Sequence, residues 1–378
     1  MEKFSAYRDP GTGIQPFLRP VPPLEVDLFV KISLPLRLAL GVIRTALVLL
    51  IGLAYIILDK CLLVFYPIYP LYALLEHSVK FILGRIALFV LGIFWIHVEQ
   101  FNRKRSRAPK LPESWNPRPG DIIVSNWSSW VEAIWLALRY NPVFVLPVPV
   151  SHSESPVPGT ASTPITHKPG RRTDTGSANV QLPSRASLSR VQFRGFQKVS
   201  LLKLISLTGH APPFDVSGSC MSLEEIQQNA GGPIVVFPEC TTSNGRGLLR
   251  FASVFRKNVP VKKYQVFIMN IRCDPPSSLA HTLTHSMPSR FINPLPELFA
   301  IAMSLAPTQM TIRLLAPSES PGSQLFIASE ILSDYSGDDQ LSEACAILIA
   351  SMGKMKRTAM GWEDKCNFLE FYESKRNG

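Results

Sequence analysis

A polar turn follows a short apolar run in the second half of the chain. Residues 234–237 (IVVF) are β-branched or aromatic, which is typical of a buried strand, and Pro238 ends the run. The turn carries a carboxylate, hydroxyls, an amide and a guanidinium, at Glu239, Thr241, Thr242, Ser243, Asn244, Gly245 and Arg246. These groups could hold a phosphate, with the guanidinium as a forked donor. A helix beginning near Gly247 would add N–H groups to such an anion site, and an ordinary strand–loop–helix connection is the alternative.

A second polar turn, residues 125–132 (SNWSSWVE), follows the expected strand 121–126 and leads into an expected amphipathic helix, 130–140. Glu132 has two interpretations, which do not exclude each other. It could line a reaction centre, or it could form a capping box with Ser129 at the start of its helix. Trp127 offers an indole N–H donor and cannot act as a general base. His152 and His210 are the nearest histidines in sequence, and no spacing links them to the turn.

Two motifs carry a resemblance to a known family. FPECTTSNGR, residues 237–246, resembles the F-P-E-G-T-x-S-x-G/N-R block of glycerolipid acyltransferases, which acylate glycerol phosphates and lysophospholipids from acyl-CoA. RDPGTGIQPFL, residues 8–18, resembles the N-terminal signature of the fungal lysophosphatidic acid:oleoyl-CoA acyltransferase branch. The resemblance implies that Glu239 through Arg246 bind the phosphate and glycerol of the acceptor. Cys240 stands where the family usually has glycine.

The turn at 125–132 aligns with the N-H-x-x-x-x-D catalytic block of the same family. In that block a histidine removes the proton of the attacking hydroxyl, and a carboxylate orients the histidine and supports its charged form. Trp127 stands at the histidine position and Glu132 at the aspartate position. The resemblance therefore places both residues at the reaction centre and leaves the general base unidentified.

The composition indicates a protein that binds negatively charged surfaces or ligands. The 378 residues include 39 Lys+Arg against 28 Asp+Glu, a net charge of +11, which suits an anionic membrane surface or a phosphate-bearing substrate. The sequence has no helix-turn-helix, RNP or zinc-finger pattern, so we expect no nucleic-acid partner. The six cysteines form no C-x-x-C pair, which favours free thiols in a reducing compartment.

Long apolar segments near the N-terminus indicate a membrane anchor. Residues 38–58 and 81–98 are almost free of charge, and a shorter block between them, 61–75, is broken by Pro67 and Pro70. Buried core helices are the alternative, and whether the segments span or form a hairpin stays open. A basic cluster at 103–107 predicts that the following chain lies on the cytosolic side.

We expect an α/β fold, with a mixed central sheet flanked by helices and an N-terminal hydrophobic helical anchor. The resemblance makes this fold similar to that of the glycerol-phosphate acyltransferases. The expected segments are a polar arm (1–33), the anchor (34–99), an acyltransferase domain (100–330) with a disordered basic insertion (151–195), and a tail (331–378) of two amphipathic helices. Further expected elements are a helix at 198–207 and strands at 143–150, 264–272 and 310–316.

The resemblance implies an acyl-CoA-dependent acyltransferase that converts a lysophospholipid, most simply lysophosphatidic acid, to phosphatidic acid. Its partners are acyl-CoA as co-substrate, the lysophospholipid and a membrane, with no cofactor and no metal. The expected location is the endoplasmic reticulum membrane or the lipid droplet, with the catalytic domain in the cytosol. The alternative is a catalytically inactive relative that binds phospholipid and acts in membrane or lipid-droplet organisation.

Overall fold

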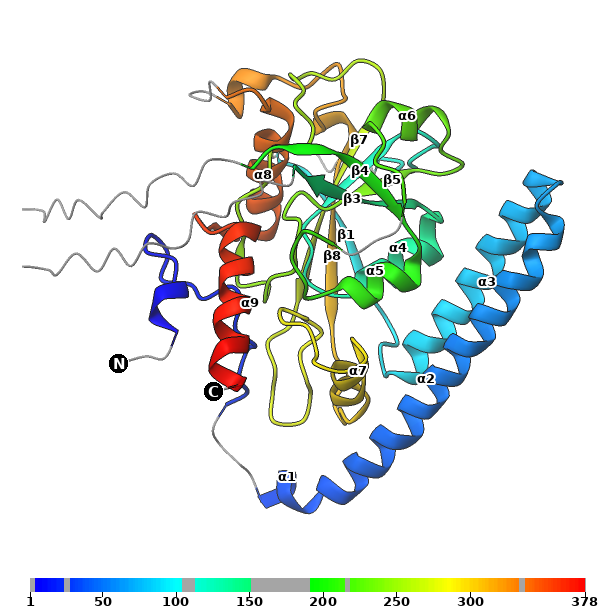
Figure 1. Cartoon of the computed structure of the whole chain (residues 1–378), viewed down its shortest axis with the longest axis vertical. Helices are drawn as coiled ribbons and strands as arrows, with labels where there is room; N and C mark the ends of the chain where they lie inside the picture. The colour runs from blue at the N-terminus through cyan, green and yellow to red at the C-terminus, as the bar shows by residue number, and fades with distance from the viewer. Residues whose placement is uncertain are drawn as a thin grey trace, which may run out of the picture.

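The computed structural model describes residues 4–23, 28–103, 113–150, 191–214, 218–332 and 337–377. At its centre is a mixed seven-stranded sheet in the order β1-β8-β7-β2-β5-β3-β4 (Figure 1). Its strands are β1 (His97–Phe101), β2 (Ile122–Ser125), β3 (Val143–Pro149), β4 (Phe193–Val199), β5 (Ile234–Val236), β7 (Val266–Cys273) and β8 (Met310–Leu315). A separate two-stranded sheet joins β6 (Gly247–Leu248) to β9 (Lys356–Arg357). The expected α/β class, with a central sheet flanked by helices, is confirmed.

The four central strands, β7, β2, β5 and β3, run parallel to one another. Ile122 of β2 pairs with Ile234 of β5 on one side and with Val266 of β7 on the other. Because these strands point the same way, the loops that follow them leave the sheet at one edge, here named the carboxyl edge. Strand β4 is antiparallel to β3, and β8 is antiparallel to β7, so β1 and β8 begin at this same edge.

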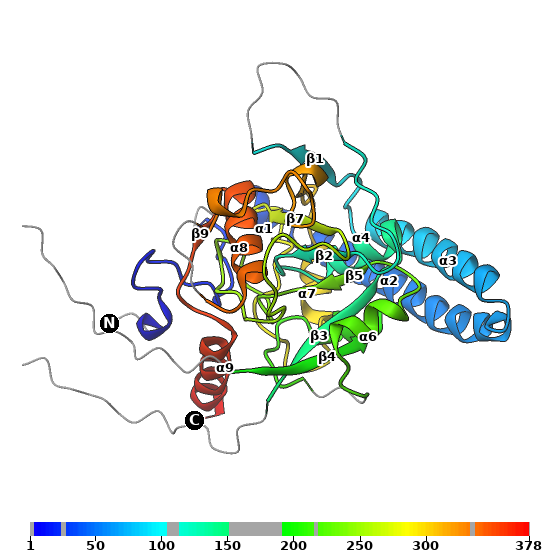
Figure 2. The ribbon, with the colours of Figure 1, turned by 90° about the horizontal axis from the view of Figure 1, so that it is seen from above.

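Successive strand residues point to opposite faces, and each face is covered by helices. Ile123 and Val235 lie in a core with α4 (Val131–Tyr140), α5 (Leu201–Leu207) and α7 (Leu295–Ala302). Their neighbours Ile122 and Val236 lie in a second core with α6 (Leu223–Gln228) and α8 (Gln340–Gly353). Seen from above, the sheet separates α8 from the N-terminal helices (Figure 2). These buried, β-branched strands explain why the parallel region reads as continuous apolar runs.

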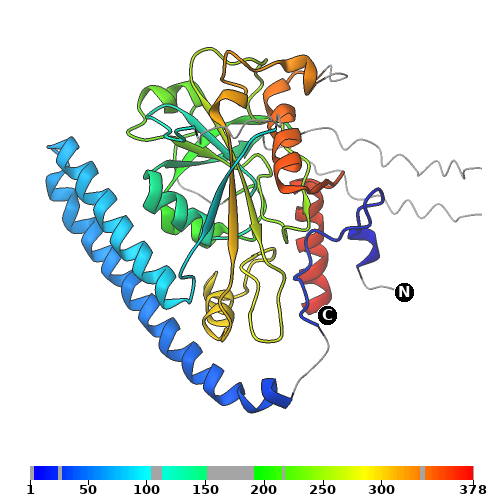
Figure 3. The same cartoon turned by 180° about the vertical axis from the view of Figure 1, so that it is seen from behind.

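The N-terminal apolar region forms a helical hairpin. After α1 (Leu28–Ile32), α2 (Leu34–Leu62) and α3 (Tyr69–Val90) run side by side along one flank of the molecule (Figure 3). Arg44 donates from its guanidinium to the backbone oxygens of Ala302 at 3.3 Å and Ser304 at 2.9 Å. A charged side chain in an apolar helix is therefore satisfied by the carboxyl end of α7.

One helical segment of the described chain, 34–65, is long and apolar enough to cross a membrane, and only 6% of its most apolar window is buried. The last of the expected apolar blocks, 81–98, is not a single helix. Helix α3 ends at Val90, Gly92 takes a positive φ of 85°, and β1 begins at His97. The last residues of that block therefore belong to the central sheet.

The two ends of the described chain pack together. The arm, which contains η1 (Ser5–Tyr7), lies beside α9 (Trp362–Asn377) in Figure 1. Phe17 of the arm and Phe368 of α9 are both buried, with ring centroids 5.6 Å apart. Leu249, Met287 and Met360 complete this cluster. The arm and the tail thus contact the loops at the carboxyl edge of the sheet.

Most of the expected elements are present, with three differences. The expected helix at 198–207 begins at Leu201, because Lys198 and Val199 finish β4 and Ser200 caps the helix with its side chain. The chain re-enters the fold at Phe193 rather than near Phe196. No helix begins at Gly247, which opens β6. The insertion at 151–190 and most of the basic cluster, 104–112, lie outside the described residues.

Candidate functional site

The two motif turns meet at the carboxyl edge. The turn after β2 and the turn after β5 are neighbours because their strands pair in register. The backbone N–H of Trp127 donates to Oε1 of Glu239 at 2.8 Å, and the N–H of Ser243 donates to the Trp127 carbonyl at 3.2 Å. Two hydrogen bonds therefore hold the two turns against each other.

Glu239 is the central acceptor of this junction. Its Oε2 also accepts the N–H of Leu249 at 3.0 Å, and the side chain is fully enclosed. Burial raises the pKa of Glu239 to about 8, while the hydrogen bonds from Trp127 and Leu249 and the charge of Lys365 act in the opposite direction. A carboxylate with two backbone N–H donors fixes the shape of the turn, whatever else it does.

Trp127 and Glu132 have structural partners. The Trp127 indole is fully buried and stacks on Phe237, with centroids 5.0 Å apart and planes 21° apart. Glu132 accepts the N–H of Ser128 at 3.1 Å and the Ser128 hydroxyl at 3.3 Å. Helix α4 begins at Val131 with Trp130 as N-cap, so the expected Ser129–Glu132 capping box is wrong. The Ser129 hydroxyl accepts the N–H of Val131 at 3.1 Å rather than that of Glu132, so the reciprocal bond of a capping box is missing.

Glu132 is nonetheless an unusual carboxyl group. Burial raises its pKa well above the ordinary value, and the nearby charge of Glu239 adds to that effect. The hydrogen bonds from Ser128 and Ser129 lower it again. Two buried carboxyl groups therefore share the junction of the two turns, an arrangement that favours keeping at least one proton between them.

The hydroxyls of the second turn bind neighbouring loops. Thr241 donates to the carbonyl of His210 at 2.7 Å, and Thr242 donates to the carbonyl of His285 at 2.6 Å. Ser243 accepts the N–H of Gly245 at 3.3 Å. These side chains are buried, whereas Arg246 is exposed at the end of the turn. Of the residues expected to bind phosphate, Arg246 alone presents its charge to solvent in the described structure.

Asn244 connects the turn to the N-terminal arm. Its Nδ2 donates to the carbonyls of Gln15 at 2.7 Å and Leu18 at 2.9 Å, and its N–H donates to the Pro16 carbonyl at 2.8 Å. The two motifs recognised in the sequence, more than 200 residues apart, are thus in direct contact. This contact supplies the physical reason for the arm motif that local sequence patterns did not.

The arm motif also has an internal structure. Asp9 is 1% exposed and accepts the N–H of Thr12 at 2.8 Å and its hydroxyl at 2.6 Å. Its other oxygen accepts the N–H of Ala359 at 2.9 Å, which joins the arm to the tail. Arg8 donates from Nε to the carbonyl of Gly13, whose φ of 71° suits glycine. These contacts account for the polar residues of the motif.

Cys240 keeps the backbone conformation that glycine prefers. Its φ is 57°, in the left-handed region, and its thiol is fully buried and donates to the Pro238 carbonyl at 3.5 Å. Burial raises the pKa of this thiol well above its ordinary value. Cysteine at this position therefore fits the left-handed turn and adds a neutral buried side chain.

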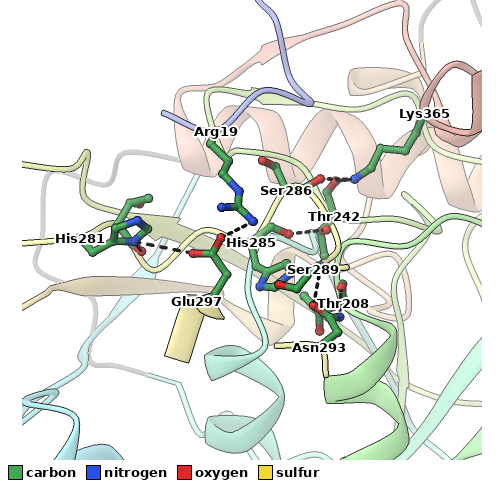
Figure 4. Close-up of polar contacts among 11 residues, drawn as sticks. Arg19, Thr208, Thr242, His281, His285, Ser286, Ser289, Asn293, Glu297 and Lys365 are labelled. Carbon is green, nitrogen blue, oxygen red and sulfur yellow. Dashed lines mark hydrogen bonds and ion pairs between the residues drawn. The ribbon is translucent and has the colours of Figure 1, made fainter. Parts of the chain in front are cut away.

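Two residues at this junction were not identified from the sequence. Lys365 on α9 is fully buried and donates from Nζ to the carbonyls of Thr242 at 2.7 Å and Ser286 at 2.5 Å (Figure 4). Burial lowers its pKa to about 7. His285 lies in the loop after β7, and its N–H donates to the Ser128 carbonyl at 2.8 Å. Neither has a motif or spacing that links it to the turns, so no local signal could have found them.

The two histidines considered from the sequence have different outcomes. His210 lies beside the second turn through its carbonyl, which accepts the Thr241 hydroxyl, and burial lowers the pKa of its ring. His152 lies outside the described residues.

Comparison with known proteins gives one relative. Across 376 residues, 99% of each chain, the protein is 23% identical to a Schizosaccharomyces pombe protein named "Putative lysophosphatidic acid:oleoyl-CoA acyltransferase". No protein-family profile matches the chain. No solved structure matches it either. The chain is therefore distantly related, over its whole length, to a protein named as an acyltransferase.

Proposed function

We propose that this protein transfers an acyl chain from acyl-CoA to the free hydroxyl of a lysophospholipid, with lysophosphatidic acid as acceptor and phosphatidic acid as product. The observation that carries the proposal is the junction of the two motif turns, where the Trp127 N–H bonds Glu239 at 2.8 Å. The full-length relationship to a named acyltransferase supports the same reaction. Acyl-CoA is the co-substrate, and no other cofactor or metal is invoked.

In this proposal the acceptor phosphate binds at the exposed end of the second turn. Arg246 is exposed there and can present a planar guanidinium to a phosphate. The reaction centre lies at the buried junction, near Glu132, Glu239 and the backbone of Trp127. The N-terminal arm covers this junction through Asn244, so acceptor entry requires residues 15–18 to move.

A cleft at the same edge of the sheet suits the acyl chain. It has a volume of about 430 Å³ and is lined by Phe94, Trp95, His97, Pro307, Thr308, Gln309, Met310 and Thr311. Met310 pairs with Cys273, whose sulfur lies 3.9 Å from the Ser128 hydroxyl. One strand pairing and one sulfur contact thus lie between the cleft and the first turn. The neighbouring α2–α3 hairpin, with its exposed apolar side chains, would hold this edge at the surface of a membrane such as the endoplasmic reticulum or a lipid droplet.

The test is an acyl-transfer assay with radiolabelled oleoyl-CoA and lysophosphatidic acid. We expect labelled phosphatidic acid from the wild type. Arg246→Gln should raise the KM for lysophosphatidic acid about 10- to 100-fold, the value of one charge-assisted hydrogen bond, and leave the KM for oleoyl-CoA unchanged. Arg194→Gln, a change at an exposed arginine on the edge strand β4, is the matched control. An equal KM for lysophosphatidic acid in the two variants would show that Arg246 does not bind the acceptor phosphate.

The second candidate is an inactive relative that binds phospholipid and organises membranes or lipid droplets. The fully buried Trp127, stacked on Phe237 where the family has a histidine, favours this candidate. Folded wild-type protein that binds vesicles of lysophosphatidic acid and phosphatidylcholine, yet turns over no lysophospholipid, would establish it.

A further inference from the structure

Three loops, rather than two, meet at the carboxyl edge. They follow the parallel strands β2, β5 and β7, which are neighbours in the sheet. His285 belongs to the third loop and is bonded to both others. Its N–H donates to Ser128 of the first at 2.8 Å, and its carbonyl accepts the Thr242 hydroxyl of the second at 2.6 Å. The histidine is thereby fixed at the junction of the two motifs.

The His285 ring is enclosed, with the Asn293 side chain beside it. The residue is 1% exposed, and among the described residues neither ring nitrogen has a partner at full hydrogen-bond geometry, although the Asn293 side chain lies close enough to favour the protonated ring. The hydroxyls of Ser286 and Ser289 are buried and unpaired in the same way. Figure 4 shows the ring between the Arg19–Glu297 ion pair and the side chains of Ser289 and Asn293. Buried polar atoms left unpaired are unfavourable, and a polar ligand group entering here would satisfy them.

We propose that His285 is the general base of the acyl transfer, in place of the histidine that Trp127 replaces. This rests on the proposed function. The neutral ring accepts the proton of the acceptor hydroxyl as that oxygen forms a bond to the thioester carbonyl carbon. The carbon–sulfur bond then breaks, and the imidazolium returns the proton to the coenzyme A thiolate. The products are the ester and free coenzyme A, with the ring neutral again.

Burial and the surrounding positive charges keep the ring neutral, and they also lower its basicity in the absence of the acceptor. Burial lowers the pKa of His285 to about 3, and the positive charges of Arg19 and Lys365, with His210, contribute. The Asn293 side chain acts in the opposite direction. The ring is therefore neutral at pH 7. The acceptor phosphate proposed to bind at Arg246 lies next to Gly245, which packs against Thr284 beside His285, so its negative charge would raise the pKa of the ring when the acceptor is bound.

The first experiment replaces the histidine in the full-length protein. His285→Gln should lower kcat for acylation of lysophosphatidic acid by about 10²- to 10⁴-fold, with both KM values within a few fold of the wild type. His281→Gln, in the same loop but with its ring partly exposed, is the matched control and should retain wild-type kcat. Thermal unfolding identifies variants that are folded. A folded His285→Gln protein with kcat within threefold of the wild type overturns the proposal and leaves the proposed function intact.

The second experiment does not depend on His285→Gln folding. Arg19 is 49% exposed and pairs with the buried Glu297, which keeps His281 at 3.9 Å when Arg19 is changed; thermal unfolding therefore checks that Arg19→Gln is folded before it is assayed. Removing this positive charge raises the pKa of His285, and the acidic limb of the pH profile for kcat should move to higher pH. If the acidic limb of the kcat profile lies at the same pH in Arg19→Gln as in the wild type, the proposal is overturned. A wild type inactive on every lysophospholipid overturns the proposed function, and this inference with it.

Discussion

The contact between the N-terminal arm and the second turn can be tested at a single side chain. In Asn244→Ala the amide that donates to the carbonyls of Gln15 at 2.7 Å and Leu18 at 2.9 Å is lost. Each such bond contributes about 0.5–1.5 kcal/mol net, so we expect the arm to be destabilised by about 1–3 kcal/mol. Because 1.4 kcal/mol is tenfold, the arm should open about 5- to 150-fold more often.

The assay is hydrogen exchange at residue 244, because its backbone N–H donates to the Pro16 carbonyl at 2.8 Å and reports arm opening directly. Asn244→Asp keeps the shape but replaces the donor with an acceptor facing two carbonyls, so it should exchange at least as fast as Asn244→Ala. Ser243→Ala is the control, since that hydroxyl accepts only the local Gly245 N–H. Exchange within twofold of the wild type in both Asn244 variants would refute a role for this amide in holding the arm.

Three further outcomes are expected. The free energy of unfolding of Cys240→Gly, measured in urea, should lie within about 1 kcal/mol of the wild-type value, because relief of the left-handed φ of 57° offsets the lost burial. That of Cys240→Val should be lower than the wild-type value by more than about 2 kcal/mol. Because burial lowers the pKa of Lys365 to about 7, the unfolded chain binds more protons above that pH, and the stability contributed by this residue rises with pH. The unfolding free energy of the wild type minus that of Lys365→Met should therefore increase by about 1–2 kcal/mol from pH 7 to 8.5. A value that does not change with pH would contradict the burial of the lysine charge. Leu50 and Leu53 of α2 are 62% and 53% exposed. Changing both to Glu should weaken binding to phosphatidylcholine–phosphatidylserine vesicles in a flotation assay about 100-fold or more, without lowering the melting temperature. Unchanged flotation would exclude this face of the helix as the membrane contact.

The sequence by itself determined the elements and the two motif turns. Period-two and continuous apolar runs identified the strands at 121–126, 234–237, 264–272 and 310–316, because burial on a sheet leaves a local pattern. The parallel pairing of β2 and β5, by contrast, was seen only in the structure. The left-handed φ of 57° at Cys240 was likewise found only in the structure.

Only the tertiary structure decided what surrounds those turns. Asn244 contacts Gln15 across 229 residues, and Lys365 contacts Thr242 across 123, so no window of sequence contains both partners. Helix α9 reads as an ordinary amphipathic tail, yet its lysine is the buried cation beside the turn. His285 carries no spacing signal because its position depends on the path of a long loop after β7. Local patterns record which residues are buried, whereas the choice of partner is made by packing between distant segments.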